Sequence, residues 1–496
     1  MATSGSKPTR RKPNPAARPQ AARPARTPQP AQPQAARQTR ASQPAQPRGA
    51  QADRAARPSQ PAGRSPRPQP ARPARAPQPA TRSSSPRPRA QASQRALPLR
   101  ESGALPVRGL VILIALIAAA ALLFSVGSCA ANALFGPSPA AAPEAAASEQ
   151  RVSFAAVGDN LPEINAAAYA DALAGEEGDG LYDYAPIYAN VKPLVEAADL
   201  AYVKQETHLG GDEIGPRGWP SFNTTDAMAD AIVATGFDLV ASASNHAYDW
   251  GTYGAVEHSR SVWNAQPVAF TGTASSAEEA AQLATVEREG ITFALLDYTY
   301  GVNGFDPSEL PAHAVNFIDE ERIRADVAAA HETADVVLVA MHWGTENLME
   351  ADAEQQRLAK LLADLEVDVV LGSHPHVIGP LEWVEGETGH QALVAYSLGN
   401  FLSHHDTPHV KNELEGMLTC DFVKDAESGD VRVENAAWTP LVNHTDEDGS
   451  FSIYPLGDYT PELAARHTLL GQEEDPLGQL NALTDQTIGD KFPINR

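Results

Sequence analysis

Residues 336–377 read VVLVAMHWGTENLMEADAEQQRLAKLLADLEVDVVLGSHPHV, and this stretch holds two apolar runs separated by a helical pattern. Val336–Met341 and Val367–Leu371 are rich in Val and Leu, which is typical of buried strands. Glu354–Leu365 between them repeats apolar residues with the period of a helix. A strand, a helix and a second strand in succession predict two parallel strands joined by a crossover helix.

The same alternation extends outward over residues 151–458, which we predict to be one α/β domain with a largely parallel sheet. Met417–Val423 and Val431–Trp438 are predicted as antiparallel edge strands, and residues 459–496 are left unassigned. The other strands are predicted at Val152–Val157, Leu200–Val203, Leu239–Ala243, Val268–Thr271, Thr292–Asp297 and Ala392–Ser397, and the other helices at Tyr188–Ala197, Asp226–Thr235, Tyr253–Asn264 and Asp319–Thr333.

Five polar clusters each follow a predicted strand. Because polar site residues of parallel sheets gather beyond the carboxyl ends of the strands, these clusters are expected at one sheet edge. Their Asp, Glu, Asn and His side chains suit Mn, Fe or Zn in a mixed nitrogen and oxygen site, with room for two ions about 3.5–4 Å apart. The clusters are Gly158–Asp159, Lys204–Thr207, Ser244–His246 with Asp249 and Gly251, His342–Glu346, and Gly372–His376.

Taken singly, each of these residues has a simpler explanation. A histidine at a strand end is more often a hydrogen-bonded structural residue than a metal ligand, and an aspartate after a strand is usually a turn or helix cap. Such explanations do not account for His-x-His, His-Trp-Gly and Asn-His signatures at successive strand ends. The joint pattern therefore favours a metal site.

In order along the chain, the blocks GDN, QET, SNHAYDWG, HWGTE, GSHPHV and YSLGNF resemble those of the CapA/PgsA family of poly-γ-glutamate capsule biosynthesis proteins, in the calcineurin-like metallophosphoesterase superfamily. The resemblance runs from Val152 to Phe401, and its HWGTE and GSHPHV blocks are specific in combination. It implies a four-layer α/β/β/α sandwich with two divalent metal ions at the sheet edge.

The resemblance also implies a role for each matching residue. His246 would protonate the leaving oxygen and Asp249 would orient it, and Glu206 would reach or bridge both metals. The segment Tyr396–Phe401 would support the histidine loops. The implied metal ligands are Asp159, Glu206, Asn245, His342, His374 and His376.

Two positions depart from the family pattern. Lys204 stands where the family usually has Asn, so it could replace a polar support or contact a substrate anion. Leu161 stands where the broader phosphoesterases have His, which argues against classical phosphatase activity more than against membership. Trp343 could stack on substrate or pack beside the site, and His404, His405 and His409 favour a surface loop over an accessory metal or substrate contact.

The N-terminal part of the chain differs sharply in composition. Residues 1–108 hold 22 Lys+Arg and 2 Asp+Glu of the chain's 38 and 62, which leaves 16 and 60 for residues 109–496 and net charges of +20 and −44. We predict a disordered cytoplasmic tail over 1–108, a transmembrane helix over 109–135 and a linker over 136–150, with the domain outside the cytoplasm. A cleaved signal peptide is the alternative.

Composition and motifs bound the function. The acidic folded part argues against nucleic-acid binding, and the chain holds no P-loop, dinucleotide fingerprint or Gly-x-Ser-x-Gly elbow. Cys129 lies in the apolar segment, so a disulfide with Cys420 is not expected. The hypotheses are a metal-dependent phosphoesterase of envelope or capsule polymer biosynthesis, a non-catalytic accessory subunit of a capsule polymer synthesis or export complex, and, with less support, a polysaccharide- or peptide-binding module.

Overall fold

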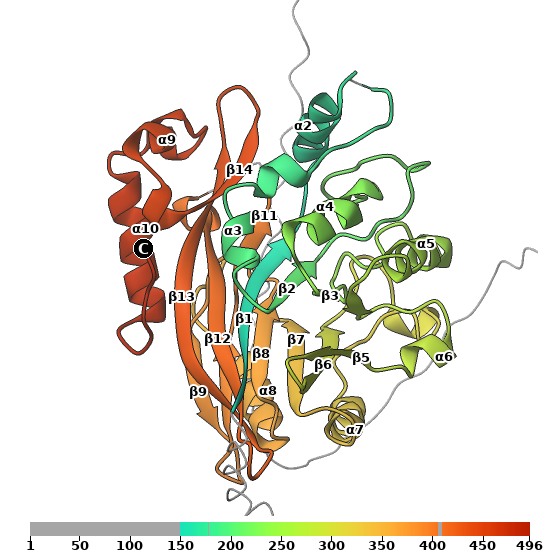
Figure 1. Ribbon diagram of the computed structural model, residues 1–496. Helices are drawn as coiled ribbons and strands as arrows, with labels where there is room; N and C mark the ends of the chain where they lie inside the picture. The colour runs from blue at the N-terminus through green and yellow to red at the C-terminus, as the bar shows by residue number, and fades with distance from the viewer. Residues whose placement is uncertain (1–148, 177, 405–408) are drawn as a thin grey trace, which may run out of the picture. The chain divides into compact units, whose positions relative to one another are not determined.

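Two β-sheets packed face to face form the centre of the structure, a computed structural model that describes residues 149–176, 178–404 and 409–496 (Figure 1). The described residues belong to one of the chain's two compact units, residues 107–496. Within them, no helix combines the length and the apolarity needed to span a bilayer. The predicted tail 1–108, the predicted membrane helix 109–135 and all but the end of the linker 136–150 lie outside the described residues.

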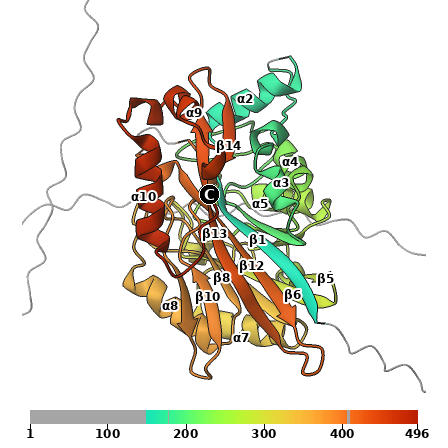
Figure 2. The ribbon, with the colours of Figure 1, turned by 60° about the vertical axis from the view of Figure 1, so that its left-hand side comes forward.

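The first sheet has eight strands in the order β14-β13-β12-β1-β2-β3-β4, with β11 paired to β1. Its half from β1 to β4 is parallel, whereas β12, β13 and β14 are antiparallel. Figure 2 shows β1, β12 and β13 running side by side. The strands are β1 (Gln150–Asn160), β2 (Leu200–Gln205), β3 (Leu239–Ala241), β4 (Ala269–Thr271), β11 (Asn400–Leu402), β12 (Leu414–Lys424), β13 (Val431–Thr445) and β14 (Phe451–Pro455).

The second sheet has six strands in the order β5-β6-β7-β8-β10-β9. The four central strands are parallel and the two edge strands are antiparallel to their neighbours. The strands predicted at Val336–Met341 and Val367–Leu371 are confirmed as the parallel neighbours β7 and β8, and the predicted crossover helix between them is found at Ala353–Asp364. The strands are β5 (Ala284–Arg288), β6 (Ile291–Thr299), β7 (Val336–His342), β8 (Val369–Ser373), β9 (Leu381–Glu385) and β10 (Gln391–Ala395).

Three apolar clusters define the layers. One lies between the sheets and joins residues such as Phe154 and Phe293. A second packs the outer face of the first sheet against α2 (Ile164–Ala174), η1 (Ala185–Tyr188), α3 (Lys192–Val195), α4 (Ala227–Thr235) and α5 (Tyr253–Asn264). The third packs the outer face of the second sheet against α7 (Glu320–His331) and α8 (Ala353–Asp364). Since adjacent strand residues point to opposite faces, each sheet buries both of its faces.

Helix α8 shows how local sequence fixes an element. Asp352 caps its first turn by accepting from the backbone N–H groups of Glu354 and Gln355, and the Gln355 side chain accepts from the Asp352 N–H in return. Leu358, Leu361 and Leu362 follow at helical spacing and are buried against the second sheet.

The C-terminal residues join the core between the sheets. The backbone of Asn495 donates to Trp438 O at 2.8 Å, and Leu480, Ile488 and Phe492 are buried in the cluster between the sheets. This segment contains η4 (Leu456–Asp458), α9 (Pro461–Arg466), η5 (Leu470–Gln472) and α10 (Pro476–Ile488), and the remaining short helices are α6 (Ala277–Ala280), η2 (Pro307–Glu309) and η3 (Val410–Asn412).

Several predicted elements need correction. The helix predicted at Tyr188–Ala197 is instead η1 and α3, each of which carries a proline in its first turn. The strands predicted at Met417–Val423 and Val431–Trp438 are antiparallel, as expected, but they are not at the edge because β14 lies beyond them. Among the elements that sequence reasoning did not identify are α2, β5, β9, β11 and β14.

Candidate metal centre

Asp159 lies near the carboxyl end of β1, where β11 inserts beside the strand. Its backbone N–H donates to Gly399 O at 3.0 Å, and a side chain at Gly158 would place Cβ 1.9 Å from that same oxygen, so the close approach requires glycine. The Asp159 carboxylate is fully buried, and its Oδ2 accepts from the His374 backbone N–H at 2.9 Å. Oδ1 finds no hydrogen-bond partner among the described residues.

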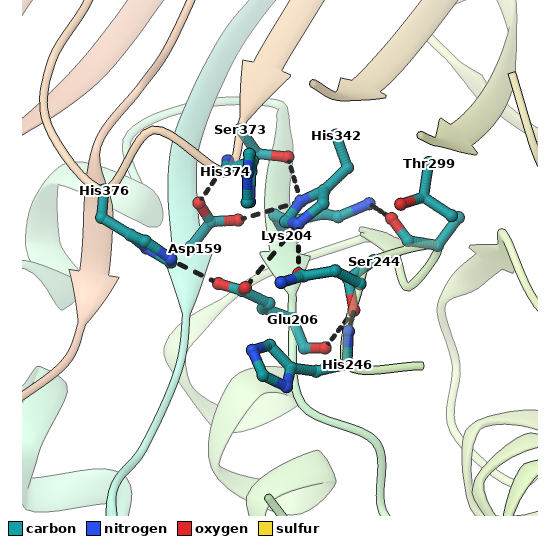
Figure 3. Close-up of polar contacts among 12 residues, drawn as sticks. Asp159, Lys204, Glu206, Ser244, His246, Thr299, His342, Ser373, His374 and His376 are labelled. Atoms are coloured by element: carbon teal, nitrogen blue, oxygen red, sulfur yellow. Dashed lines mark hydrogen bonds and ion pairs between the residues drawn. The ribbon is translucent and has the colours of Figure 1, made fainter. Parts of the chain in front are cut away.

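Glu206 follows β2, and its carboxylate faces His342 and His376 (Figure 3). It is fully buried, and neither oxygen accepts a hydrogen bond from any described residue. Oε1 lies 3.7 Å from His342 Nε2, and Oε2 lies 3.9 Å from His376 Nδ1. Burial, followed by the neighbouring Asp159, holds the pKa of Glu206 well above its usual value, so the ionised form needs a cation.

His342 ends β7 and sits between its neighbours in fixed contacts. Ser373 Oγ lies 2.9 Å from its Nδ1, and Asn245 Oδ1 lies 2.7 Å from its Nε2. Burial, followed by the nearby His374, lowers the pKa of His342 well below its usual value. The imidazole is therefore neutral at pH 7, which is the form that binds a metal.

The two histidines that follow β8 both adopt left-handed backbone conformations. His374 has φ 94° and His376 has φ 56°, a region that non-glycine residues rarely occupy and that is found in strained functional loops. Burial lowers the pKa of His374 to about 3, and its Nδ1 has no hydrogen-bond partner in the described part of the chain. His376 Nδ1 lies 2.8 Å from Asn400 Oδ1.

Three overlapping groups of side chains could each hold a cation. Buried carboxylate oxygens without partners are costly unless a positive charge compensates them, and here they face imidazole nitrogens that are ready to bind a metal. The donor set therefore fits divalent metal binding. The groups are Glu206, His342 and His374; Asp159, Glu206 and His376; and Glu346, His374 and His376.

His246 and Asp249 form a pair beside these residues. His246 Nδ1 lies 2.7 Å from Asp249 Oδ2, and both side chains are buried. The same Oδ2 accepts from the Phe222 N–H at 2.7 Å, so the carboxylate is held on two sides. His246 and His376 both line a cavity of about 570 Å³ that opens over the centre.

The structure brings all eight predicted site residues together at the carboxyl ends of the parallel strands. Figure 3 shows six of them, Asp159, Glu206, His246, His342, His374 and His376. Lys204 is fully buried and pairs with Asp297, so it is a polar support with no contact to the cavity. Trp343 packs in the core and donates from Nε1 to Tyr396 O at 3.0 Å. Leu161 and His409 line the cavity, whereas His405 lies outside the described residues.

Sequence reasoning did not single out Ser373, Asn400 or Tyr300. Ser373 and Asn400 contact the ring nitrogens of His342 and His376, and both stand inside the sequence blocks already recognised. Tyr300 packs on His374 with ring centroids 4.8 Å apart, and burial raises its pKa to about 12. No motif marks Tyr300, because its role depends on β6 ending beside β7.

The fold and the site define a class: α/β proteins whose packed sheets gather carboxylates and imidazoles into a metal-type centre at the ends of parallel strands. Residues 153–405, about half of the chain, match the family described as bacterial capsule synthesis protein PGA_cap, and the chain belongs to this family. The resemblance to the CapA/PgsA family is thereby confirmed.

Two curated relatives are similar over part of their length. One is a PGA biosynthesis protein CapA of Bacillus subtilis, 30% identical over 173 residues that cover 34% of this chain and 42% of the relative. The other is a capsule biosynthesis protein CapA of Bacillus anthracis, 25% identical over 178 residues, 35% of this chain and 41% of the relative. The match thus spans less than half the length of each relative.

Solved structures are similar at lower identity. A phosphatase from Mycoplasma pneumoniae is 13% identical, with a TM-score of 0.36 over 59% of this chain and 95% of that chain. A 5′-nucleotidase precursor from Thermus thermophilus is 15% identical, with a TM-score of 0.35 over 68% of this chain and 58% of that chain.

Proposed function

We propose that this protein is a metal-dependent phosphoesterase with the four-layer α/β/β/α fold of the calcineurin-like metallophosphoesterases. It would act in the biosynthesis of a cell-envelope or capsule polymer of the poly-γ-glutamate type. The observation that carries the proposal is the set of buried carboxylate oxygens on Asp159 and Glu206 that lack hydrogen-bond partners among the described residues and face histidine nitrogens. Membership in the capsule synthesis family supports the polymer context.

Two divalent ions, Mn, Fe or Zn, would share Glu206, whose two oxygens face different histidines. Asp159 and His376 complete one ligand set, and His342 and His374 complete the other, with Asn245 Oδ1 adjacent to His342 Nε2. When bound, the ions would polarise a phosphoryl oxygen and stabilise the charge that develops on it.

His246 supplies the proton that the leaving oxygen needs. Its Nδ1 is engaged by Asp249, which fixes the ring orientation and leaves Nε2 as the nitrogen that can transfer a proton at the cavity wall. The Phe222 ring packs edge-on against His246, with centroids 4.6 Å apart, and limits its movement.

The location of the domain is part of the same proposal. The uncharged run 109–135 is proposed as a single membrane anchor, with Arg100 and Arg108 on its cytoplasmic side and the domain outside. Protease added to intact cells should then spare residues 1–108 and digest exposed loops of the domain. Digestion of residues 1–108 under those conditions would reverse the orientation.

A second candidate is a non-catalytic accessory subunit of a capsule polymer synthesis or export complex. The observation in its favour is the +20 charge of residues 1–108, since a basic cytoplasmic arm can bind protein partners or the anionic leaflet. In that case the metal centre would be structural.

Metal analysis of the purified full-length chain, together with phosphomonoester and phosphodiester assays with added Mn²⁺, separates the two candidates. The phosphoesterase should bind close to two ions per chain, and His246→Ala should lower hydrolysis by about 10²–10⁴-fold without releasing metal. His331→Ala is the matched control, because His331 lies at the end of α7 and bonds to Leu365 O. Bound metal without hydrolysis of either ester class would favour the accessory subunit.

A further inference from the structure

Trp219 is the most exposed large apolar side chain at the site. It is 75% exposed, yet it lines the cavity of about 570 Å³ that also contains His246 and His376. A ligand that enters the cavity can cover this exposed indole without disrupting existing packing, and burying the apolar face of the ring favours binding.

The backbone that carries Trp219 is fixed. The Trp219 N–H donates to Glu163 Oε2 at 3.2 Å, and Arg217 pairs with Asn223 in a short antiparallel bridge. A Cβ at Gly218 would lie 2.1 Å from the same Glu163 oxygen, so glycine allows the loop to approach this close. Because the loop backbone is held in advance, only the indole itself has to be ordered when a ligand stacks on it, which limits the entropy lost on binding.

The same loop is bonded to the proton-donor pair. Three residues after Trp219, Phe222 donates its N–H to Asp249 Oδ2 at 2.7 Å and packs its ring against His246. Trp250 Nε1 donates to Phe222 O at 2.9 Å and fixes the loop from the other side. The contacts of Phe222 thus join the loop that carries Trp219 to His246, which suits a platform for the group attached to the reacting phosphate.

The charges on the cavity wall indicate what that group is. Glu163 and Glu346 contribute two carboxylates against one ammonium, Lys411, which donates to Asn347 O at 2.6 Å. A polycarboxylate chain would meet like charge here. The two carboxylates instead accept hydrogen bonds from hydroxyl groups, and the Asn303 amide can donate to them as well as accept. An exposed indole covers the C–H face of a sugar ring.

We propose that Trp219 is a stacking platform for a sugar ring, and that the substrate is a sugar phosphate or a glycosyl-linked phosphodiester. This inference rests on the proposed phosphoesterase function and names the substrate class of the same site. The phosphate lies toward His246 and His376, and the ring lies on Trp219. Specificity then comes from the neutral, hydroxyl-rich group next to the phosphate.

The test compares full-length wild type with Trp219→Ala and Trp219→Phe on a hexose 1-phosphate and on glycerol 2-phosphate, whose three-carbon skeleton cannot cover an indole. Trp219→Ala should raise KM for the hexose phosphate about tenfold with little change in kcat. The increase for glycerol 2-phosphate should be several times smaller, and Trp219→Phe should recover most of the loss. Trp383→Ala on β9, 41% exposed and absent from the cavity wall, should match wild type.

Calorimetric binding of the hexose 1-phosphate and of adenosine monophosphate separates the remaining outcomes. Binding that depends on Trp219 without hydrolysis would retain the platform and overturn the phosphoesterase. A Trp219→Ala loss seen for the nucleotide and absent for the hexose would overturn the sugar and assign a base-stacking surface. Equal losses on hexose and glycerol phosphates, or no loss on either, would overturn the platform.

Discussion

The ammonium group of Lys204 lies 2.6 Å from Asp297 Oδ1, and both side chains are fully buried. Lys204 belongs to β2 in the first sheet and Asp297 to β6 in the second, so the pair joins the two sheets beneath the candidate metal centre. Asp297 Oδ2 also accepts from the Ala243 N–H at 2.5 Å, and Ser244 Oγ donates to Glu206 O at 2.6 Å. The ion pair thus holds the segment that leads into Asn245 and His246.

Replacing Lys204 with Met should destabilise the protein by about 3–5 kcal/mol, because Asp297 then keeps a buried carboxylate without its cation. Urea unfolding at pH 7 measures the change. Lys360→Met is the matched control: Lys360 pairs with Asp364 on the surface of α8, where the loss should stay within about 1 kcal/mol.

The double variant Lys204→Met with Asp297→Leu extends this comparison. Replacing both partners removes the uncompensated charge, so the double variant should be more stable than Lys204→Met alone. A double variant less stable than the single one would contradict this account of the pair.

Chelation should expose the cost of the buried carboxylates. With excess EDTA the wild type should melt at a lower temperature than with Mn²⁺, because a cation that binds only the folded state stabilises it. Glu206→Gln removes one carboxylate that has no hydrogen-bond partner among the described residues. In EDTA the free energy of unfolding of this variant should therefore be about 1–2 kcal/mol higher than that of the wild type. Thermal unfolding with and without metal checks both statements, and equal melting temperatures for the wild type would contradict the metal centre.

The sequence predicts the parts of this fold that depend on short-range pattern. The helix Tyr253–Asn264 is found with its predicted bounds, and β7 covers the apolar run Val336–Met341, whereas β8 begins two residues after its predicted start at Val367. The site residues could be selected because the carboxyl ends of parallel strands converge, so adjacency in the sheet replaces adjacency in the chain.

The parts that sequence did not predict depend on contacts made by distant segments. β11 has three residues and exists because Asn400 pairs with Asp159 on β1. β5 is an edge strand whose partly exposed residues carry a weak apolar signal. The role of Lys204 could not be decided, because its partner Asp297 lies 93 residues away on the other sheet.

Removing the carboxylate that orients His246 should affect the chemistry more than the fold. Asp249→Ala frees His246 Nδ1 and leaves the ring free to rotate or change tautomer, so kcat should fall by about 10²-fold while bound metal stays constant. Steady-state kinetics with parallel metal analysis measures this. Asp226→Ala breaks the His258–Asp226 contact of 2.9 Å on the surface and should leave kcat unchanged, whereas metal loss in Asp249→Ala would assign Asp249 to the ligand set.

Asp368 should make stability depend on pH in the direction opposite to an ordinary surface carboxylate. Burial raises its pKa from 3.8 to about 7, so the folded state keeps a proton that the unfolded state has already released. This contribution is complete below about pH 4 and is lost as the pH rises toward 7. Asp368→Asn keeps an oxygen for the Val337 N–H, 2.8 Å away, but it cannot ionise. The variant should therefore be more stable to unfolding than wild type by about 2 kcal/mol at pH 8 and no more stable at pH 4.

Asp199, whose pKa is lowered by its bonds to Ser153, is the control: Asp199→Asn should lose stability above pH 4. Urea unfolding across pH 4–8 checks both, and a wild type more stable than Asp368→Asn at pH 8 would show that the ionised carboxylate is favoured in the folded state.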